Sequence, residues 1–206
     1  MSNNKPITQA VYDGIYEGIV NGDITTNDIL TEGKLCERYG ASKSPIREAL
    51  VMLCSQNILQ SIPRTGYRLL QIMPKEVEDL LEAREALELY LLEKTIRELT
   101  PEKMATLTAV HEDNVRDEQE RHSVRDNWRR NMAFHLALAS LGDNALLLEA
   151  LRQLLQSCER AATQYFQGRK NRGEYEELHI PLLKAMEDRD TQTACAILRR
   201  DIHQLL

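Results

Sequence analysis

Five polar residues in the second half of the chain occupy positions on otherwise apolar helical stripes. Each lies three, four or seven residues from several large apolar side chains, which predicts that it faces the interior of a helical domain. Burial of such groups is unfavourable unless they pair with one another or bind a metal ion. Because the five come from four separate stripes, we expect them to converge on one interior site. They are Arg84, Asn131, His135, His179 and Asp201.

Four of these residues could bind a divalent metal ion. Asn131 and His135 are four residues apart and therefore neighbours on one helix face. His179 and Asp201 would come from facing helices, as in the metal sites of helical bundles. His203 competes for the last position, but it shares its face with two arginines, which favours Asp201. The candidate metal ligands are thus Asn131, His135, His179 and Asp201.

Two other interpretations of this pattern stay open. In the first, the histidines are core residues with ordinary hydrogen-bond partners, and Arg84 forms a buried pair with Asp201 or Glu88. In the second, two histidines and a carboxylate hold a metal that activates water, as in a hydrolase. That reaction needs a general base, for which Glu174, Glu176 and Glu177 are the candidates. Acidic residues that precede a helix are more often solvated, so we expect a protein that is not an enzyme.

A second group of residues suggests binding to nucleic acid. The chain as a whole carries a net charge of -6, but residues 42–70 hold four basic residues against Glu48 alone. The apolar residues of the segment that begins near Pro45 follow helical spacing and leave Arg47 on the exposed face, with Lys43 just before it. An exposed basic helix fits the major groove of DNA, so a double-stranded DNA partner is expected.

The elements that would position this basic helix are short and densely interrupted by Gly and Pro. A first helix ends at Asn21 and Gly22, and a second runs from a cap at Thr31 to Gly40. The third helix is expected to start at Ser44 or Pro45. Residues 58–62 and 67–70 then read as two strands around the turn at 63–66. Three helices and a hairpin predict a winged helix-turn-helix over residues 1–73.

The second half, residues 74–206, is predicted to be entirely helical and to follow a linker at about 71–74. Six helices are expected, with caps at Thr100, Ser123 and Asp190, and with Pro181 either moving a helix start towards Glu177 or kinking that helix. Their ranges are 75–98, 101–117, 123–140, 144–167, 175–189 and 191–205. The fold class is therefore mainly α, an N-terminal winged helix-turn-helix followed by a six-helix ligand-binding bundle.

Composition limits the classes of protein further. The 206 residues are 42% hydrophobic and 28% charged, no run of 18 apolar residues occurs, and the N-terminus is polar. We therefore expect a cytoplasmic protein with no membrane partner. The four cysteines form no Cys-x-x-Cys pair and are expected to be reduced core thiols.

The segment from Leu30 to Leu53 closely resembles the DNA-binding segment of GntR-type bacterial transcription regulators. The shared core is SKSPIREAL, residues 42–50, although Thr26 and Asn27 stand where that family usually has Pro-Gly, and Gly33 where it often has a basic residue. The resemblance implies that the DNA contacts come from the start of the third helix and from the wing tip. The residues implied are Lys43, Ser44, Arg47, Arg64, Thr65 and Gly66.

The second half resembles the FCD ligand-binding domain found in one branch of these regulators, the FadR-like subfamily. The matching features are Arg84-x-x-x-Glu88, Phe134-His135, Asn144-x-x-Leu147, and His179 eleven residues before Asp190. In that family an Asp and three His commonly bind a divalent metal, and Asn131 and Asp201 depart from that pattern here. The exchange keeps one carboxylate in the set and favours harder metals. The resemblance implies a metal of the Zn, Ni or Mn type.

These inferences combine into one expected function, that of a metabolite-responsive transcription regulator. A homodimer would bind a palindromic operator, and a small carboxylate metabolite would bind in the helical domain, near the metal or Arg84. Carboxylates suit both a guanidinium and an open metal position. The alternative is the same regulator with a metal-free ligand pocket.

Overall fold

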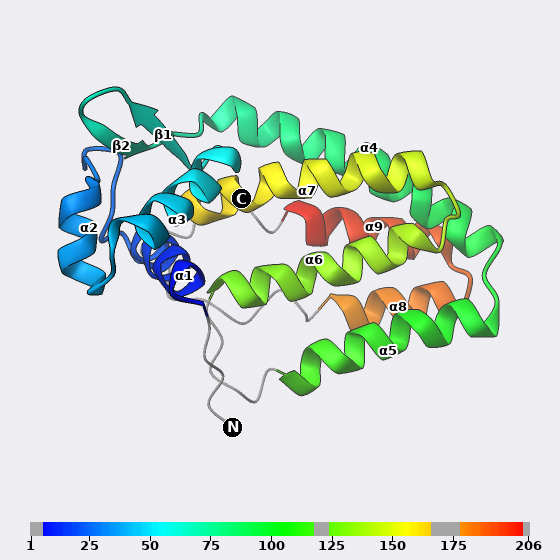
Figure 1. Ribbon diagram of the computed structural model, residues 1–206. Coiled ribbons are helices and arrows are strands. Elements are labelled where there is room, and N and C mark those ends of the chain that lie inside the picture. Colours follow the sequence, from blue (N-terminus) through cyan, green and yellow to red (C-terminus); the bar gives the residue numbers. More distant parts are fainter. Residues whose placement is uncertain (1–5, 118–123, 166–177, 204–206) are drawn as a thin grey trace. The chain divides into compact units, whose positions relative to one another are not determined.

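The computed structural model describes residues 6–117, 124–165 and 178–203. Within these ranges the chain divides into two compact units, the first of residues 6–73 and 160–165 and the second of residues 74–159 and 178–203. The break after Met73 lies within the linker expected at 71–74, whereas the grouping of residues 160–165 with the first unit was not expected. Figure 1 labels the helices and strands along the chain. No helix in these ranges is both long enough and apolar enough to cross a membrane.

The first unit is a three-helix cluster with a two-stranded hairpin, as the Gly and Pro pattern predicts. Its elements are α1 (Ile7–Val20), α2 (Glu32–Tyr39), α3 (Lys43–Ser55), β1 (Leu59–Ile62) and β2 (Gly66–Leu69). Helix α1 packs on α3 through fully buried Tyr12 and Ile15, and α3 contributes Ile46 and Leu50 to the same core. This core holds α3 in place and leaves its opposite face exposed to solvent.

Helix α2 begins and ends at the residues that the sequence indicates. The Thr31 hydroxyl accepts a hydrogen bond from the amide of Lys34, which satisfies one of the free donors of the first turn. Gly40 ends the helix in the left-handed conformation, at φ 59°. The start of α2 is therefore fixed by its own cap.

Helix α3 starts at Lys43, not at the expected Ser44 or Pro45. Ser42 is the extended residue that precedes it, with φ -71° and ψ 168°. Pro45 is consequently the third helical residue, a position whose amide has no partner within the helix and where proline is still tolerated. The expected exposed face is confirmed, since Ser44, Arg47, Glu48 and Val51 all face solvent.

The hairpin is tied back to the start of α2 by a short backbone bridge. Strands β1 and β2 are antiparallel, with Leu59 opposite Leu69 and Ile62 opposite Gly66. The amide of Leu30 donates to the Tyr67 carbonyl and the amide of Tyr67 donates to the Leu30 carbonyl, both at 2.8 Å. A Cβ added at Gly66 would lie 2.3 Å from the Leu30 carbonyl oxygen. Only glycine permits this approach of wing to helix.

The second unit is a helical bundle, whose helices are labelled in Figure 1. They are α4 (Pro74–Arg97), α5 (Pro101–Asp117), α6 (Val124–Ser140), α7 (Ala145–Tyr165), α8 (His179–Glu187) and α9 (Thr191–His203). Helix α4 packs on α6 and α9, α5 packs on α6 and α8, and α8 packs on α9. The expected caps Thr100 and Asp190 accept from the amides of Lys103 and Thr193. The expected cap Ser123 lies outside the described residues.

Pro181 does not kink α8, contrary to one of the two expectations. The helix starts at His179, which makes Pro181 the third residue of its first turn, where its missing amide breaks no helical hydrogen bond. Residues 175–177, where the helix was expected to begin, lie outside the described residues. The start at His179 means that a candidate ligand stands at the end of a helix rather than within it.

The expectation of four reduced core thiols needs a correction. All four cysteines are free, but only Cys158 is buried, and burial raises the pKa of its thiol to about 11. The other three are half-buried. Their spacing from apolar neighbours placed them at the edge of helical stripes, where one side of the residue still meets solvent.

Candidate functional sites

The exposed start of α3 carries the first candidate site. Lys43 and Ser44 are exposed, and the Ser44 hydroxyl donates to Glu48 at 3.1 Å. Arg47 is also exposed, but its guanidinium group is hydrogen-bonded to Glu32. Its Nε donates to Glu32 Oε1 at 2.9 Å and its Nη2 donates to Glu32 Oε2 at 2.8 Å. These hydrogen bonds lower the pKa of Glu32 and raise that of Arg47.

The wing tip carries three further residues of this site. Arg64 and Thr65 are exposed, and the Thr65 amide donates to the Ile62 carbonyl at 3.0 Å to close the turn. Arg64 has φ 63°, a conformation that a non-glycine residue rarely adopts. Such a conformation persists when the surrounding structure determines it, as the closed turn does here. The third residue is Gly66. A side chain at this position would clash with the Leu30 carbonyl oxygen.

The second candidate site is a cluster of polar side chains inside the bundle. It draws Arg84 and Glu88 from α4, Asn131 and His135 from α6, His179 from α8, and Asp201 from α9. None of the six residues is more than 5% exposed. The expectation that the inward polar residues lie together is therefore met for His135, His179 and Asp201. Asn131 stands one helical turn before His135 and is equally buried.

Arg84 and Glu88 form a buried ion pair that continues to His135. Arg84 Nε donates to Glu88 Oε1 at 2.5 Å, and Glu88 Oε2 lies 2.6 Å from His135 Nδ1. Burial alone would raise the pKa of Glu88, but the charges of Arg84 and His135 lower it to about 2. Burial lowers the pKa of His135, but the charge of Glu88 outweighs this effect and raises it. The contact with Glu88 at Nδ1 thus fixes the orientation of the His135 ring.

The opposite edge of His135 faces the other two residues. His135 Nε2 lies 2.9 Å from Asp201 Oδ2, and His179 Nε2 lies 3.9 Å from the same oxygen. His179 is stacked on Phe134, with ring centroids 3.8 Å apart. Burial, together with the charge of His135, lowers the pKa of His179 to about 3. His179 is therefore neutral at pH 7, and both of its ring nitrogens lack a hydrogen-bond partner.

Several buried polar atoms of the cluster have no hydrogen-bond partner within the described residues. They are Arg84 Nη2, Asn131 Oδ1, both ring nitrogens of His179 and Asp201 Oδ1. His135 Nε2 and Asp201 Oδ2 lie 2.9 Å apart but do not have hydrogen-bond geometry. Buried polar groups are nearly always satisfied, so this many unsatisfied atoms in one place calls for a missing partner. The oxygen atoms and the imidazole nitrogens of this set could coordinate a metal ion. The guanidinium nitrogen of Arg84 could donate a hydrogen bond to an anion.

The spacing of these atoms suits a metal ion. One ligand atom from each of His135, His179 and Asp201 lies within 4.8 Å of the others. Two atoms bound to one ion at about 2.1 Å lie about 3 to 3.5 Å apart. The 2.9 and 3.9 Å separations bracket this range. The spacing of these three ligand atoms therefore fits a small divalent cation.

His111 was not identified from the sequence, and Glu88 was considered only as a partner of Arg84. In the structure Glu88 also contacts His135. His111 of α5 is buried, and its ring centroid lies 5.8 Å from that of His179. The signal was its spacing from Leu107 and Asn114, both also buried. His203, the competitor of Asp201, is half-buried and lies 2.9 Å from Glu85 at the edge of the bundle.

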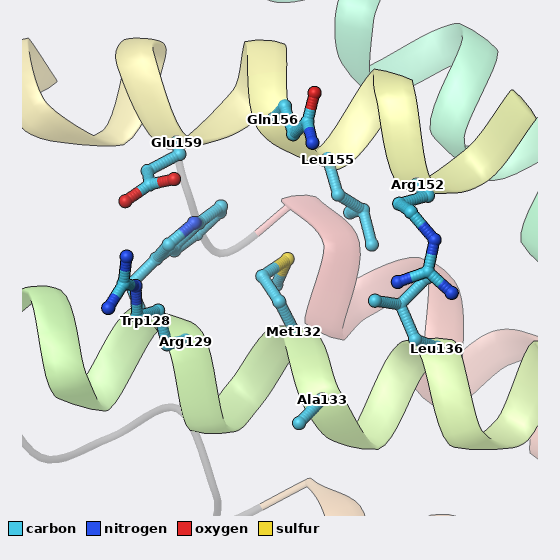
Figure 2. A pocket seen from close by; sticks show the side chains of 9 residues that line it. All are labelled: Trp128, Arg129, Met132, Ala133, Leu136, Arg152, Leu155, Gln156 and Glu159. Carbon is cyan, nitrogen blue, oxygen red and sulfur yellow. The ribbon is translucent and has the colours of Figure 1, made fainter. Parts of the chain in front are cut away.

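The bundle also contains a cavity that the sequence did not indicate. Figure 2 shows it between α6 and α7, with Trp128 and Met132 projecting from α6 towards Leu155 of α7. Its volume is about 260 Å³. Arg129 and Arg152 also line it. A second hollow of about 530 Å³ lies on α5, near Arg189. The general bases considered for a hydrolase, Glu174, Glu176 and Glu177, lie outside the described residues.

The fold and the first site define the class of protein. A winged helix-turn-helix with an exposed basic helix, followed by a helical bundle with a buried polar cluster, is the architecture of a two-unit DNA-binding transcription regulator. Residues 7–69 match the gntR family of bacterial regulatory proteins, and residues 79–204 match the FCD domain. The chain belongs to the gntR family, in the branch that carries an FCD domain.

Individual relatives agree with this assignment. YdhC of Bacillus subtilis, an uncharacterized HTH-type transcriptional regulator, is 27% identical over 150 residues, which cover 71% of this chain and 67% of YdhC. The Escherichia coli HTH-type transcriptional regulator McbR is 28% identical over 120 residues, 58% of this chain and about half (54%) of McbR. The solved structure of E. coli McbR/YncC has a TM-score of 0.64 at 24% identity and covers 97% of this chain and 94% of that one.

These families consist of transcription regulators and not of enzymes. The hydrolase interpretation is therefore set aside. What the buried cluster binds is a separate question, because the family assignment names no ligand for this chain.

Proposed function

We propose that this chain is a metabolite-responsive transcription regulator, in which the buried cluster of the second unit binds a divalent metal and a small carboxylate. The observation that carries the proposal is the set of unsatisfied buried atoms around His135, His179 and Asp201. Buried polar atoms in a structural core usually have partners, as His135 Nδ1 has in Glu88, so the remaining unsatisfied atoms support a bound ligand.

The metal would be held by Asn131, His135, His179 and Asp201. When bound, it would supply an open coordination position for a carboxylate oxygen. Glu88 supports this role because a carboxylate on Nδ1 of a histidine keeps Nε2 free as a ligand. The neutral state of His179 supports it as well, because only unprotonated imidazole can coordinate. With two nitrogens and two oxygens, we propose an ion of the Zn, Ni or Mn type.

Arg84 would bind the effector. Its Nε is engaged by Glu88, but its Nη2 is buried and without a partner. A buried guanidinium nitrogen in this state is a strong site for a carboxylate oxygen. The Arg84 side of the cluster therefore favours a small organic acid.

The DNA-binding form would be a homodimer on a palindromic operator, with Lys43, Ser44 and Arg47 at the major groove and the wing tip of Arg64, Thr65 and Gly66 on the backbone. Two-fold symmetry of the protein would match two half-sites about one helical turn apart. Ligand would change operator affinity through unequal binding to two dimer arrangements, and a coupling of about 1–3 kcal/mol is enough for a switch.

The test is metal analysis of protein purified without a histidine tag, followed by a thermal-shift screen of small organic acids with and without added Mn²⁺, Ni²⁺ or Zn²⁺. The proposal expects about one metal per chain, and acids that raise the melting temperature only when metal is present. Light scattering checks the dimer. Protein that carries no metal, and gains no stability from added metal, would contradict the metal site.

A metal-free pocket is the second candidate, and one observation favours it. His135 lies between two carboxylates, with Glu88 at 2.6 Å from Nδ1 and Asp201 at 2.9 Å from Nε2. A protonated imidazole would balance their charge without an ion. In that case an acid would raise the melting temperature equally in the presence of a strong chelator.

A further inference from the structure

We propose that Glu32 is a positioning residue for DNA recognition, which holds the Arg47 guanidinium so that its outer edge reads a guanine. The inference rests on the proposed role of Arg47 at the major groove and adds a residue to it. Glu32 belongs to α2, fifteen residues before Arg47. It lies within the segment from Leu30 to Leu53 but outside the shared core of residues 42–50, and it is not among the residues implied to contact DNA.

The geometry of the pair leaves one particular edge of the guanidinium free. Glu32 accepts from Nε and Nη2, so it occupies the side edge through two parallel hydrogen bonds. A guanidinium carries five N–H donors in a planar fork. Three N–H donors remain, two on Nη1 and one on Nη2. One from each of these nitrogens forms the end edge of the fork, which points away from Glu32. The Arg47 side chain is 61% exposed, so this end edge is accessible.

That free edge has the shape that guanine requires. A guanine presents two acceptors, O6 and N7, side by side in the major groove, and a bidentate arginine is its most common specific partner. An unrestrained arginine has several rotatable bonds and also binds phosphates without regard to sequence. A carboxylate that fixes the plane of the fork removes part of that freedom before DNA arrives.

Glu32 is itself held in place by the backbone around it. Thr31 caps the helix immediately before Glu32, and Leu30 is bridged to Tyr67 of the wing. The bridge depends on Gly66, whose missing side chain lets the wing approach Leu30. The wing therefore sets the position of the carboxylate that orients Arg47, and the hairpin contributes to recognition without a base contact of its own.

An ordinary surface ion pair is a poor explanation for this carboxylate. Exposed pairs contribute little to stability, because solvent screens them. A negative charge close to a DNA surface also repels phosphates and weakens association. A glutamate at this position is thus unfavourable for DNA binding unless it improves the contact that its partner makes.

The experiment measures how much binding depends on the N7 atom of guanine. A duplex is selected from a random pool by the wild-type chain, and each guanine in it is replaced in turn by 7-deazaguanine, which lacks N7. Dissociation constants are measured by fluorescence anisotropy for wild type, Arg47→Ala, Glu32→Ala and Glu32→Gln. Glu37→Ala, an exposed change of equal charge on the same helix, is the control.

For the guanine read by Arg47, we expect the 7-deaza replacement to weaken wild-type binding about tenfold and to leave Arg47→Ala unaffected. Glu32→Ala and Glu32→Gln should lose most of this sensitivity, whereas Glu37→Ala should keep it. In the Arg47→Ala background, Glu32→Ala should leave affinity unchanged or increase it, because only the repulsion of phosphates is then removed. Circular dichroism should show the same fold for all variants.

The outcomes separate the inference from the function on which it rests. If Arg47→Ala binds the selected duplex as wild type does, Arg47 does not read DNA and both fall. If Arg47→Ala weakens binding while Glu32→Ala keeps the full sensitivity to N7, only the positioning role is overturned. The same holds if Glu32→Ala weakens binding in the Arg47→Ala background, since Glu32 would then touch the DNA itself or support the fold.

Discussion

Two of the arginine–glutamate pairs among the described residues differ in their surroundings, Arg47 with Glu32 in the first unit and Arg84 with Glu88 in the second. Their shortest distances are 2.8 and 2.5 Å. The side chains of the first pair are 61% and 25% exposed, and those of the second are 1% and 2% exposed. The same chemistry therefore operates in water in one case and in a dry interior in the other.

The degree of burial determines how much each pair contributes to the stability of the fold. An exposed pair is worth about 0 to 1 kcal/mol of stability, so the first pair can be altered with the fold intact, and its effect appears in binding. Removal of one partner of a buried pair leaves an uncompensated charge and costs about 3–5 kcal/mol. The second pair is therefore expected to matter for the stability of the bundle, and the proposed ligand site lies beside it.

The largest expected effect comes from Glu88→Ala. It leaves Arg84 buried without its counter-charge and removes the partner of His135 Nδ1, so unfolding free energy should fall by about 3–5 kcal/mol. Urea denaturation of the full chain measures this change. Glu85→Ala is the matched control on the same helix, because Glu85 pairs with Arg199 at the surface, and it should cost less than about 1 kcal/mol. Equal midpoints for the two variants would contradict the assigned difference.

His135→Ala should remove the stabilisation that added metal provides. If the wild-type chain binds metal at the cluster, metal at 100 times its dissociation constant stabilises it by about 2.7 kcal/mol. His203→Ala removes a half-buried histidine at the edge of the bundle and should keep this gain. Differential scanning calorimetry, with and without Mn²⁺ or Ni²⁺, compares the two. A gain that survives in His135→Ala would place the metal elsewhere.

Arg47→Ala should weaken binding to the selected operator by about 1–3 kcal/mol, as expected for the loss of a bidentate base contact. The melting temperature should hardly change, because its ion pair is exposed. Arg97→Ala, an exposed arginine of α4, controls for the loss of one positive charge. An anisotropy titration in which the two variants behave alike would remove Arg47 from the DNA-reading surface.

The smallest effect is expected at Arg64→Gly. Glycine adopts the positive φ of this position without strain, so stability should stay equal or rise slightly. Operator affinity should fall by a similar amount for all sequences, and the dependence of log affinity on log salt should weaken by about one unit, as one phosphate contact is lost. An unchanged salt dependence would show that the wing tip does not touch the backbone.

Only one of the two ion pairs could be predicted from the spacing of residues in the sequence. The pair of Arg84 and Glu88 lies at i and i+4 on one helix, so it was among the pairings that spacing allowed. Arg47 and Glu32 stand on different helices, and the pair depends on how the wing holds the start of α2. No local pattern in either helix contains that information.

Helix ends were predictable where the terminal position accepts only a few residue types. The cap at Thr31 and the left-handed Gly40 were both confirmed, because few other residues serve in those positions. The start of α3 was wrong by one or two residues, since proline is tolerated at several positions of a first turn. His111 was missed because its stripe is short and mixed, and only the packing of α5 on α6 and α8 shows that it is buried.

The central claim is that one chain joins a buried ligand site to an exposed DNA-reading site. The most direct test takes each small carboxylic acid that raises the melting temperature and measures operator affinity at saturating acid and without it. The account predicts a change of about 5- to 150-fold in either direction, absent in His135→Ala. An acid that stabilises the wild-type chain through the cluster and leaves operator affinity unchanged would contradict it.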